Sequence, residues 1–297
     1  MNASVNVVFL LTCHNRRDKT LACLERIFAQ HYLPHVDARV VLVDDGSTDG
    51  TSAAVKTHYP SVHVVRGTGS LFWAGGMSLA MQKAREYGNA TYYILLNDDT
   101  LLFEHALGDL LAGDAYAQSA YGSSGLLVGS TLDPESKTFS YGGHALLKPH
   151  SYAVRDLPPN GRYQEAHFCN ANILLLPAVV LERMGFFDPY YIHSIADFDY
   201  SYRVHKAGLP VLVLPNYLGT CTDDHRAPGT RHLKSFRKRL NYLYSSKGFA
   251  YREFMHFVRT HFPRKAFTTG MSLWFRALLP ELWDLWKRPV KSNREAA

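Results

Sequence analysis

The chain up to residue 96 alternates between short apolar runs and segments whose apolar residues recur at helical spacing. The runs are mostly apolar throughout, which is typical of strands that are buried on both faces. This order predicts parallel strands in one sheet, because each helix returns the chain to the same edge. We therefore expect an α/β fold with helices on both faces, with strands at 5–11, 39–43, 62–65 and 92–96 and helices at 18–30, 51–59 and 74–87.

Residues 121–220 have shorter apolar runs, separated by turns rich in glycine and proline. The clearest turn signals are Gly142–Gly143 and Pro158–Pro159. This part of the chain is expected to add shorter strands and two more helices. The expected strands are 125–130, 138–141, 163–168, 173–176 and 211–214, and the expected helices are 178–184 and 197–207.

The chain after residue 220 is basic and aromatic, with a helical pattern. Residues 221–297 hold 16 Lys and Arg against 6 Asp and Glu, a net charge of +10, whereas residues 1–220 have a net charge of −4. Such asymmetry indicates an anionic partner, for example a lipid surface, a phosphorylated substrate or a nucleic acid. The Trp, Leu and Arg of residues 271–286 suit a helix in a membrane interface, or one that packs on the rest of the chain or on a second subunit.

Other features bear on the cellular setting. No run of 18 apolar residues is present, so we expect no membrane-spanning helix. Residues 1–12 lack the basic start and the cleavage site of a secretory signal. The four cysteines form no C-x-x-C pair and no zinc-ligand spacing. A cytoplasmic protein with reduced thiols is therefore expected.

Each of the four expected parallel strands ends in a polar cluster. Because open α/β sheets bind ligands at the carboxyl ends of their strands, we expect the clusters to form one site. Asp98 and Asp99 follow a buried strand, and Mg²⁺ or Mn²⁺ would be a natural partner for them because these cations prefer oxygen ligands. A turn with a helix cap is the alternative for this segment alone. The clusters are 12–16 (TCHNR), 44–49 (DDGSTD), 67–70 (GTGS) and 97–99 (NDD).

The ordered set of clusters resembles the inverting glycosyltransferases of family 2, which have the GT-A fold. The resemblance extends over residues 4–225 and includes Gly185-Phe186-Phe187-Asp188 and Ala196-Asp197-Phe198-Asp199, followed by Arg203. Each motif alone is common, whereas their order and spacing are specific. The resemblance implies a GT-A domain at 1–225, with a Rossmann-like nucleotide-binding sheet and mixed strands on the acceptor side. Residues 226–297 would form a helical C-terminal extension.

The resemblance implies that the strand-end clusters bind a nucleoside diphosphate sugar. Asp44 or Asp45 would accept a hydrogen bond from the N3–H of the base, and the glycines would let the backbone approach the ligand closely. A dinucleotide fingerprint does not fit the glycine-rich loop, because Phe72 stands where its third glycine would be. The residues implied in nucleotide-sugar binding are Thr12, His14, Asn15, Arg16, Asp44, Asp45, Gly67, Gly75, Gly76, Asn97 and Asp98.

The D-x-D motif of the family corresponds to Asn97-Asp98-Asp99, in which a carboxamide replaces the first carboxylate. The resemblance implies Asp99 as the direct ligand of Mg²⁺ or Mn²⁺, and Asp98 as a second ligand or a contact to the ribose or sugar. His225 is a candidate third ligand, since imidazole binds Mn²⁺ acceptably. The metal would bridge the diphosphate and neutralise charge as the leaving group departs.

The resemblance assigns the general base to Asp197. The family has a Glu-Asp pair at the start of a helix, and Ala196 replaces the Glu here. The alternatives are a helix cap for Asp197, core packing for Trp73 and an ion pair with Arg203 for Asp199. The candidates for the acceptor side are Asn170, Asp199 and Trp73.

The implied function is transfer of a sugar, with inversion, from a UDP- or dTDP-sugar to a hydroxyl. The similarity is to bacterial rhamnosyl- and galactofuranosyltransferases that build surface polysaccharide, such as lipopolysaccharide O-antigen, on lipid-linked acceptors. It implies a place at the inner face of the cell membrane and no nucleic acid partner, and leaves a homo-oligomer open. One rival is a sugar-phosphate nucleotidyltransferase, which would need the glycine-rich basic loop that residues 12–20 lack. The other is a non-catalytic sugar-nucleotide-binding protein, favoured by the lost carboxylates at Asn97 and Ala196.

Overall fold

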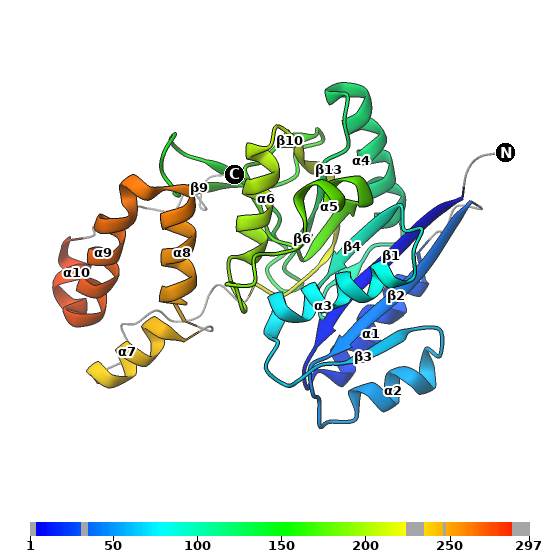
Figure 1. The fold of residues 1–297 in the computed structure, drawn as a ribbon, viewed down its shortest axis with the longest axis horizontal. Helices are drawn as coiled ribbons and strands as arrows, with labels where there is room; N and C mark the ends of the chain where they lie inside the picture. Colours follow the sequence, from blue (N-terminus) through cyan, green and yellow to red (C-terminus); the bar gives the residue numbers. More distant parts are fainter. Residues whose placement is uncertain (1–3, 31–34, 224–234, 246–247, 287–297) are drawn as a thin grey trace. The chain divides into compact units, whose positions relative to one another are not determined.

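A computed structural model describes residues 4–30, 35–223, 235–245 and 248–286 (Figure 1). The chain divides into two compact units. The first, called the α/β unit, comprises Met1–Pro149 and Ala153–Asp224, and the second, called the helical unit, comprises His150–Tyr152 and His225–Ala297.

Four parallel strands form one half of the main sheet, as the sequence pattern predicts. β1 (Val5–Cys13) lies between β2 (Val36–Asp44) and β4 (Tyr92–Leu96), and β3 (His63–Arg66) pairs with β2 at the edge. The central residues of β1, β2 and β4 are buried, because helices cover both faces of this half.

The other half of the sheet is mixed. β12 (Ile173–Pro177) runs antiparallel to β4 and to β6 (Leu126–Leu132), and β13 (Val211–Thr220) runs parallel to β6. The short strands β5 (Leu101–Leu102), β7 (Phe139–Tyr141) and β10 (Gln164–Glu165) complete it. The GT-A-like expectation of parallel nucleotide-side strands followed by mixed strands is confirmed.

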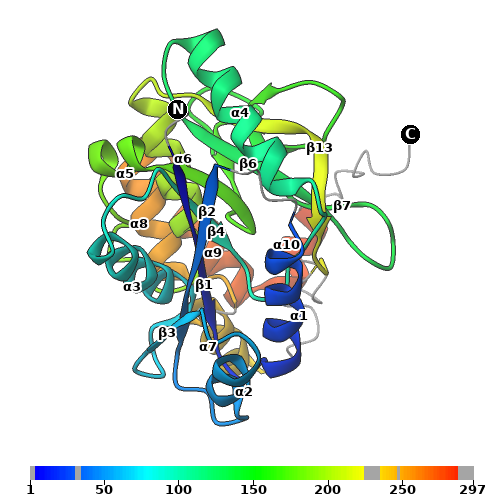
Figure 2. The same cartoon turned by 90° about the vertical axis from the view of Figure 1, so that its right-hand side faces the viewer.

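Helices enclose the sheet as the alternating order requires. In Figure 2, α1 (Arg17–Phe28) and α3 (Phe72–Glu86) lie on opposite faces of the parallel strands. α1 buries Thr20, Cys23, Leu24 and Ile27, a helical spacing of three to four residues. α2 (Thr51–His58) connects β2 to β3. α4 (Ala106–Tyr121), which the sequence reading did not anticipate, packs on β6 and β13.

A second, three-stranded sheet corrects two sequence expectations. The segment expected as one strand at 163–168 is two strands in different sheets: β10 pairs with β13, whereas β11 (Phe168–Cys169) pairs with β8 (Gly143–Leu146). Gly142 is not part of a tight turn but joins β7 of the main sheet to β8 of the small one. β9 (Val154–Leu157) forms the other edge. α5 (Ala178–Met184) and α6 (Ala196–Lys206) follow β12.

The helical unit contains α7 (Phe236–Tyr244), α8 (Tyr251–His261), a 3₁₀ turn at Pro263–Lys265, α9 (Ala266–Leu278) and α10 (Pro280–Trp286). The aromatic segment 271–286 is therefore two helices, because Pro280 has no N–H to continue α9 and instead begins α10. Tyr152 belongs to this unit through the rings of Phe254 and Phe262. No helix in the described ranges is long and apolar enough to cross a membrane.

Candidate functional site

The carboxyl ends of β1, β2, β3 and β4 meet at one edge of the sheet. Cys13 at the end of β1 lies beside Asp44 of β2, which in turn lies beside Arg66 of β3. β4 flanks β1 on the other side. The four polar clusters of the sequence are therefore brought together, as the topology of a parallel sheet requires.

The loops after β1 and β2 are joined by hydrogen bonds. His14 Nδ1 lies 2.7 Å from the carbonyl oxygen of Asp45. The backbone N–H of Asn15 donates to Ser47 Oγ at 2.9 Å, and Asn15 Oδ1 accepts from the backbone N–H of Thr48 at 2.7 Å. These contacts give the strand edge a defined shape without any bound ligand.

Asp45 is bound by the loop that follows β3. Its carboxylate accepts hydrogen bonds from the backbone N–H groups of Gly69 (2.7 Å), Leu71 (2.9 Å) and Phe72 (3.0 Å). Because α3 begins at Phe72, Asp45 satisfies N–H groups that the start of a helix leaves without intrahelical partners. This carboxylate therefore holds the glycine-rich loop and α3 in place.

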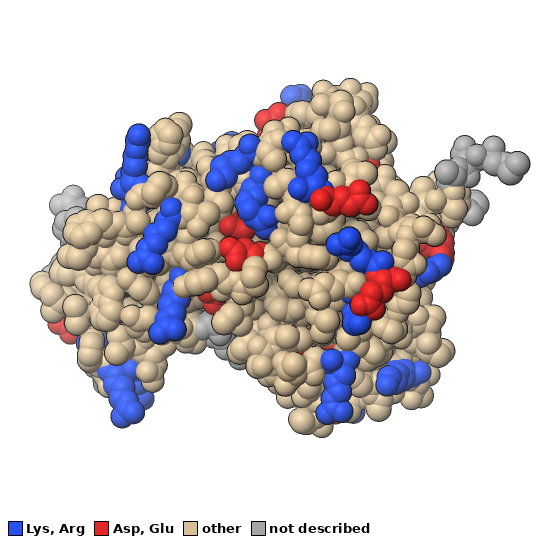
Figure 3. Space-filling view, in the orientation of Figure 1, with Lys and Arg blue, Asp and Glu red and all other residues tan. Residues whose placement is uncertain are grey.

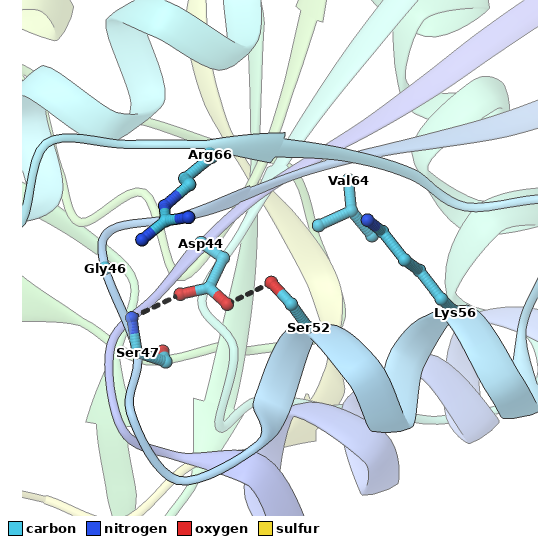
Figure 4. Close-up of a pocket in the computed structure, with 7 residues that line it drawn as sticks. All are labelled: Asp44, Gly46, Ser47, Ser52, Lys56, Val64 and Arg66. Atoms are coloured by element: carbon cyan, nitrogen blue, oxygen red, sulfur yellow. Dashed lines mark hydrogen bonds between the residues drawn. The ribbon is translucent and has the colours of Figure 1, made fainter.

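Asp44 is likewise satisfied within the protein. Its carboxylate accepts from the backbone N–H of Ser47 at 2.8 Å and from the hydroxyl of Ser52 in α2. The hollow beside it, about 240 Å³, is lined by Asp44, Gly46, Ser47, Ser52, Lys56, Val64 and Arg66 (Figure 4). It is smaller than the about 300–1,000 Å³ of typical small-molecule pockets, so it would not enclose a whole nucleotide sugar.

Two of the expected glycines serve close packing inside the protein. A Cβ on Gly67 would come within 2.9 Å of Asp45 Cα, and a Cβ on Gly76 would collide with the side chain of Thr12. Gly75 is less constrained, since its Cβ would meet Leu71 Cβ at 3.3 Å. Glycine is thus required at 67 because the loop after β3 passes close to Asp45, and at 76 because α3 packs against Thr12. From the sequence, these glycines were expected to make room for a ligand.

Asp98 and Asp99 form an acidic pair at the end of β4. Arg16 Nη1 lies 2.9 Å from Asp98 Oδ1 and 2.9 Å from Asp99 Oδ2, and Lys19 Nζ lies 3.7 Å from Asp99 Oδ2. Burial raises the pKa of Asp98 to about 6, Arg16 opposes the shift and the neighbouring charge of Asp99 adds to it. The pair is therefore short of positive charge even with Arg16 in contact.

The donor set of this pair fits a hard divalent cation. Its carboxylate oxygens are the ligands that Mg²⁺ and Mn²⁺ prefer, and a further cation would relieve the repulsion between Asp98 and Asp99. Within the described ranges no group of three or more His, Cys, Asp or Glu side chains forms a metal cage. Mg²⁺ is commonly held by one or two carboxylates together with phosphates and water, so two suffice. The third candidate, His225, lies outside the described residues.

Asn97 has a structural partner. Its Oδ1 accepts a hydrogen bond from the indole Nε1–H of Trp73 at 2.7 Å, and the ring of Trp73 stacks on Phe187 with 5.6 Å between centroids. A carboxamide oxygen at the first position of the motif thus anchors the start of α3. Trp73 is held on both sides, which favours the packing interpretation over a contact with an acceptor sugar.

Asp197 lies in the first turn of α6. Its Oδ2 accepts from the backbone N–H of Ala171 at 3.2 Å and its Oδ1 from the N–H of Phe198 at 2.9 Å. Burial raises the pKa of Asp197, while these hydrogen bonds and the nearby His144 oppose the shift. A carboxylate with a raised pKa is a better proton acceptor than an exposed one, which is what a general base needs.

The turn at 170–172 connects Asp197 to the acidic pair. Ala171 holds the Asp197 carboxylate, and the carbonyl oxygen of Asn172 accepts from the backbone N–H of Asn97 at 3.2 Å. The turn leads into β12, which pairs with β4. The turn therefore contacts both the candidate base and Asn97, the residue before the candidate metal ligands Asp98 and Asp99.

Asp199 is buried, with 2% of its surface exposed. It accepts from Arg203 Nε at 2.8 Å and from the hydroxyl of Tyr191 at 3.1 Å. This arrangement favours the ion pair with Arg203 over a contact with an acceptor.

Two residues beside Asp197 had no signal in the sequence. His144 on β8 lies 2.8 Å from Asn170 Oδ1 through Nε2 and 3.1 Å from Asp156 Oδ1 through Nδ1. A single histidine in a short strand, and an aspartate twelve residues later, match no motif. Cross-strand pairing of His144 with Asp156 brings them together.

Comparisons with known proteins bear on the family and the fold of this chain. Residues 9–118 match the family described as Glycosyl transferase family 2. Mannosyltransferase PcManGT from Pyrobaculum calidifontis, solved with GDP-Man and Mn²⁺, is 17% identical with a TM-score of 0.52, and the match covers 80% of this chain and 62% of that one. S. aureus TarS 1-349 in complex with UDP is 14% identical with a TM-score of 0.57, covering 92% and 79%.

A third structure, GalNAc-T7 with UDP, GalNAc and Mn²⁺, is 15% identical with a TM-score of 0.53, and the match covers 72% of this chain and 43% of that one. A search of curated proteins finds no match. At these identities the structural similarity establishes the fold, and the family match covers the strand-end clusters of β1, β2 and β4. Residues 9–118 therefore match glycosyltransferase family 2, and the chain has the GT-A fold.

Proposed function

We propose that this protein transfers a sugar, with inversion, from a UDP- or dTDP-sugar to a hydroxyl of a growing, lipid-linked surface glycan. The observation that carries the proposal is the junction at residues 170–172. It ties a buried carboxylate of raised pKa, Asp197, to the acidic pair Asp98 and Asp99. A proton acceptor beside a site for an anionic leaving group is what an inverting transfer needs.

In this proposal Asp197 is the general base. Its carboxylate takes the proton of the acceptor hydroxyl while the hydroxyl oxygen forms a bond to the anomeric carbon. The bond between the anomeric carbon and the phosphate oxygen breaks on the opposite face, and the nucleoside diphosphate leaves with the electron pair. One displacement inverts the anomeric configuration. The raised pKa makes Asp197 a better acceptor for that proton than an exposed carboxylate would be.

The donor would lie on the edge formed by β1, β2, β3 and β4. Asp98 and Asp99 would hold Mg²⁺ or Mn²⁺, which when bound would offset charge on the leaving diphosphate. Arg16 lies between both carboxylates and could move to a phosphate oxygen when a metal takes its place. Thr12, His14 and Asn15 would line the nucleotide side. The GDP-Man and Mn²⁺ bound to PcManGT and the UDP and Mn²⁺ bound to GalNAc-T7 support a nucleotide-sugar donor and a divalent metal.

The helical unit supports a place for the acceptor at an anionic membrane. Phe267, Met271 and Leu278 of α9 are 79%, 59% and 48% exposed, and their spacing of four and seven residues puts them on one face. We call them the α9 stripe. The part of Figure 3 that contains α7–α10 shows Lys and Arg side chains with few acidic ones. Exposed cations of this unit are Arg237, Lys238, Arg252, Arg259, Arg264 and Lys265.

An exposed apolar stripe with basic neighbours suits the surface of an anionic bilayer better than water. We therefore propose that residues 1–225 form the catalytic domain and residues 226–297 a membrane-binding extension. The resemblance of the sequence motifs to rhamnosyl- and galactofuranosyltransferases of O-antigen synthesis is the reason to propose a lipid-linked acceptor at the inner membrane face.

The first test combines donor binding with turnover. Melting temperature is measured against UDP-, dTDP-, GDP- and CMP-sugars with and without Mn²⁺, where saturation at about 100 times Kd stabilises by roughly 2.7 kcal/mol. For the donor that binds, we expect the wild type to release the nucleoside diphosphate. The variant Asp197→Asn should bind the same donor but release no nucleoside diphosphate. Formation of a nucleoside triphosphate and a sugar 1-phosphate from the same donor and added pyrophosphate would instead indicate a nucleotidyltransferase. Binding without turnover on a panel of lipid-linked acceptors would indicate a non-catalytic protein.

The second test is flotation of the full-length protein with vesicles. We expect binding to phosphatidylcholine vesicles that contain phosphatidylglycerol, and its loss in the double variant Phe267→Ser, Met271→Ser. Val179→Ser on α5 is the matched control, because Val179 is 61% exposed but lies outside the helical unit. If the double variant floats as well as the Val179→Ser control, the helical unit does not bind membrane through the α9 stripe. A protein that forms a dimer through the α9 stripe and binds no vesicles would also contradict the proposal.

A further inference from the structure

His144 is the central residue of a polar chain in the small sheet. It is 8% exposed and lies on β8 between the edge strands β9 and β11. Its Nδ1 lies 3.1 Å from the carboxylate of Asp156, directly across the antiparallel pair, and its Nε2 lies 2.8 Å from Asn170 Oδ1. Both partners are acceptors, and an imidazole that donates from both nitrogens carries a positive charge.

His144 contacts one of the two residues that donate to Asp197 and the residue next to the other. Asn170 precedes Ala171, whose N–H donates to Asp197 Oδ2 at 3.2 Å. The His144 ring also packs on Phe198, with 5.1 Å between centroids, and the N–H of Phe198 donates to Asp197 Oδ1 at 2.9 Å. His144 thus contacts the neighbours of both hydrogen bonds that orient the Asp197 carboxylate.

We propose that His144, held by Asp156, is a positioning residue that orients Asn170 and Asp197 toward the acceptor hydroxyl. This deepens the proposed function, on which its catalytic meaning rests. In the described part of the chain no group accepts from Asn170 Nδ2, so this amide is available to donate to a hydroxyl of the acceptor sugar. A base held by a fixed second group is the usual arrangement for proton transfer in enzymes.

The electrostatic surroundings of Asp197 give His144 a second effect. Burial raises the pKa of Asp197, and the charge of His144 lowers it. The other ionisable groups nearby are Asp156 on β9, which pairs with His144, and Cys169 on β11, whose pKa burial raises so that it stays a neutral thiol. On α6 itself, Asp199 is paired with Arg203. Removal of His144 should therefore move Asp197 toward the protonated form.

A substrate-free measurement tests this directly. The Asp197 carboxyl is titrated by NMR in protein labelled with ¹³C at the aspartate carboxyl groups, and its signal is identified by its absence in Asp197→Asn. We expect the titration midpoint to rise by about half a pH unit or more in His144→Phe. His144→Gln, which keeps a polar partner for Asn170 without the charge, should show the same rise and serves if the Phe variant does not fold. His205→Gln, on the far part of α6, is the matched control. An unchanged midpoint in both His144 variants overturns the proposal.

Kinetics then separate positioning from stability. We expect kcat to fall about 10- to 100-fold in His144→Phe, with the acidic limb of its pH profile moved upward and the donor KM unchanged within about twofold. His144→Gln should recover part of kcat but not the position of the limb. A lower melting temperature with the acidic limb unmoved would indicate a purely structural residue. If the wild type transfers no sugar, the proposed function fails, while the NMR titration still decides whether His144 acts on Asp197.

Discussion

β2 and β4 each end in two adjacent aspartates, and the two pairs are used differently. Asp44 and Asp45 accept hydrogen bonds from four backbone N–H groups and one serine hydroxyl. Asp98 and Asp99 are met by the side chains of Arg16, Lys19, Thr20 and Cys221. Backbone donors cannot be exchanged without unfolding a loop, whereas side-chain cations can move aside for a ligand. Both pairs lie at strand ends, so this position does not distinguish them. The kind of hydrogen-bond donor does: backbone N–H groups hold Asp44 and Asp45 in the fold, whereas side chains surround Asp98 and Asp99, the pair that we propose for metal and phosphate.

The largest expected effect is the loss of activity in Asp99→Asn. If this pair serves the donor, transfer should fall by at least about 100-fold, which corresponds to about 2.7 kcal/mol in the barrier. The melting temperature should change little, because Arg16 keeps Asp98 as a partner. Steady-state transfer with Mn²⁺ measures this. Full activity in the variant would remove the distinction between the two pairs.

The mirror-image change is Asp45→Asn, which should act on stability. An amide offers one acceptor oxygen where three N–H groups now converge, so buried donors lose their partner. We expect a loss of about 2–4 kcal/mol in the free energy of unfolding, measured by urea denaturation. A variant that unfolds at the wild-type urea concentration but no longer binds the nucleotide would instead make Asp45 a base-reading residue.

Asp98→Asn should stabilise the metal-free protein. The pKa of Asp98 is raised to about 6, so the folded state binds its proton more tightly than the unfolded chain, and stability falls as pH rises from about 4 to about 6. The variant lacks this loss and should be more stable than the wild type by up to about 3 kcal/mol at pH 7.5, with the difference vanishing below about pH 4. Thermal unfolding at both pH values is the measurement. With added Mn²⁺ the wild type should become more stable than the variant at pH 7.5. If the variant is less stable than the wild type without metal, Asp98 and Asp99 are not short of positive charge.

The smallest effect is expected for Asn97→Asp, which restores the first carboxylate of the motif. Trp73 Nε1–H can still donate to the new carboxylate, so the packing of α3 should persist. A third adjacent charge should lower metal-free stability by about 1 kcal/mol or less, and Mn²⁺ should restore it. The Mn²⁺ dependence of the melting temperature checks this, compared with Trp73→Phe, which removes the indole donor together with part of the ring that stacks on Phe187. A variant insensitive to Mn²⁺ would place the metal away from Asn97.

Much of the architecture was predictable because it follows local rules. The continuous apolar runs of β1, β2 and β4 and the helical spacing of apolar residues in α1 are patterns that can be recognised directly in the sequence. The small sheet was not predictable, because β8, β9 and β11 have two to four residues each and carry no periodic signal. Asn170 and Asp197 could be expected from a motif. The place of His144 near them depends on the pairing of β8 with β9, which the sequence alone does not reveal.

The sequence by itself determined that four polar clusters would meet at one edge, because buried parallel strands joined by helices leave no other place for them. It also determined a basic, aromatic C-terminal part, since composition needs no fold. Only the tertiary structure decided which Asp-Asp pair is closed off, because the loop after β3 brings its N–H groups to Asp45 and no such loop reaches Asp98 in the described chain. It likewise decided what surrounds Asp197, because its hydrogen-bond donor Ala171 and its charged neighbour His144 lie 26 and 53 positions away along the chain.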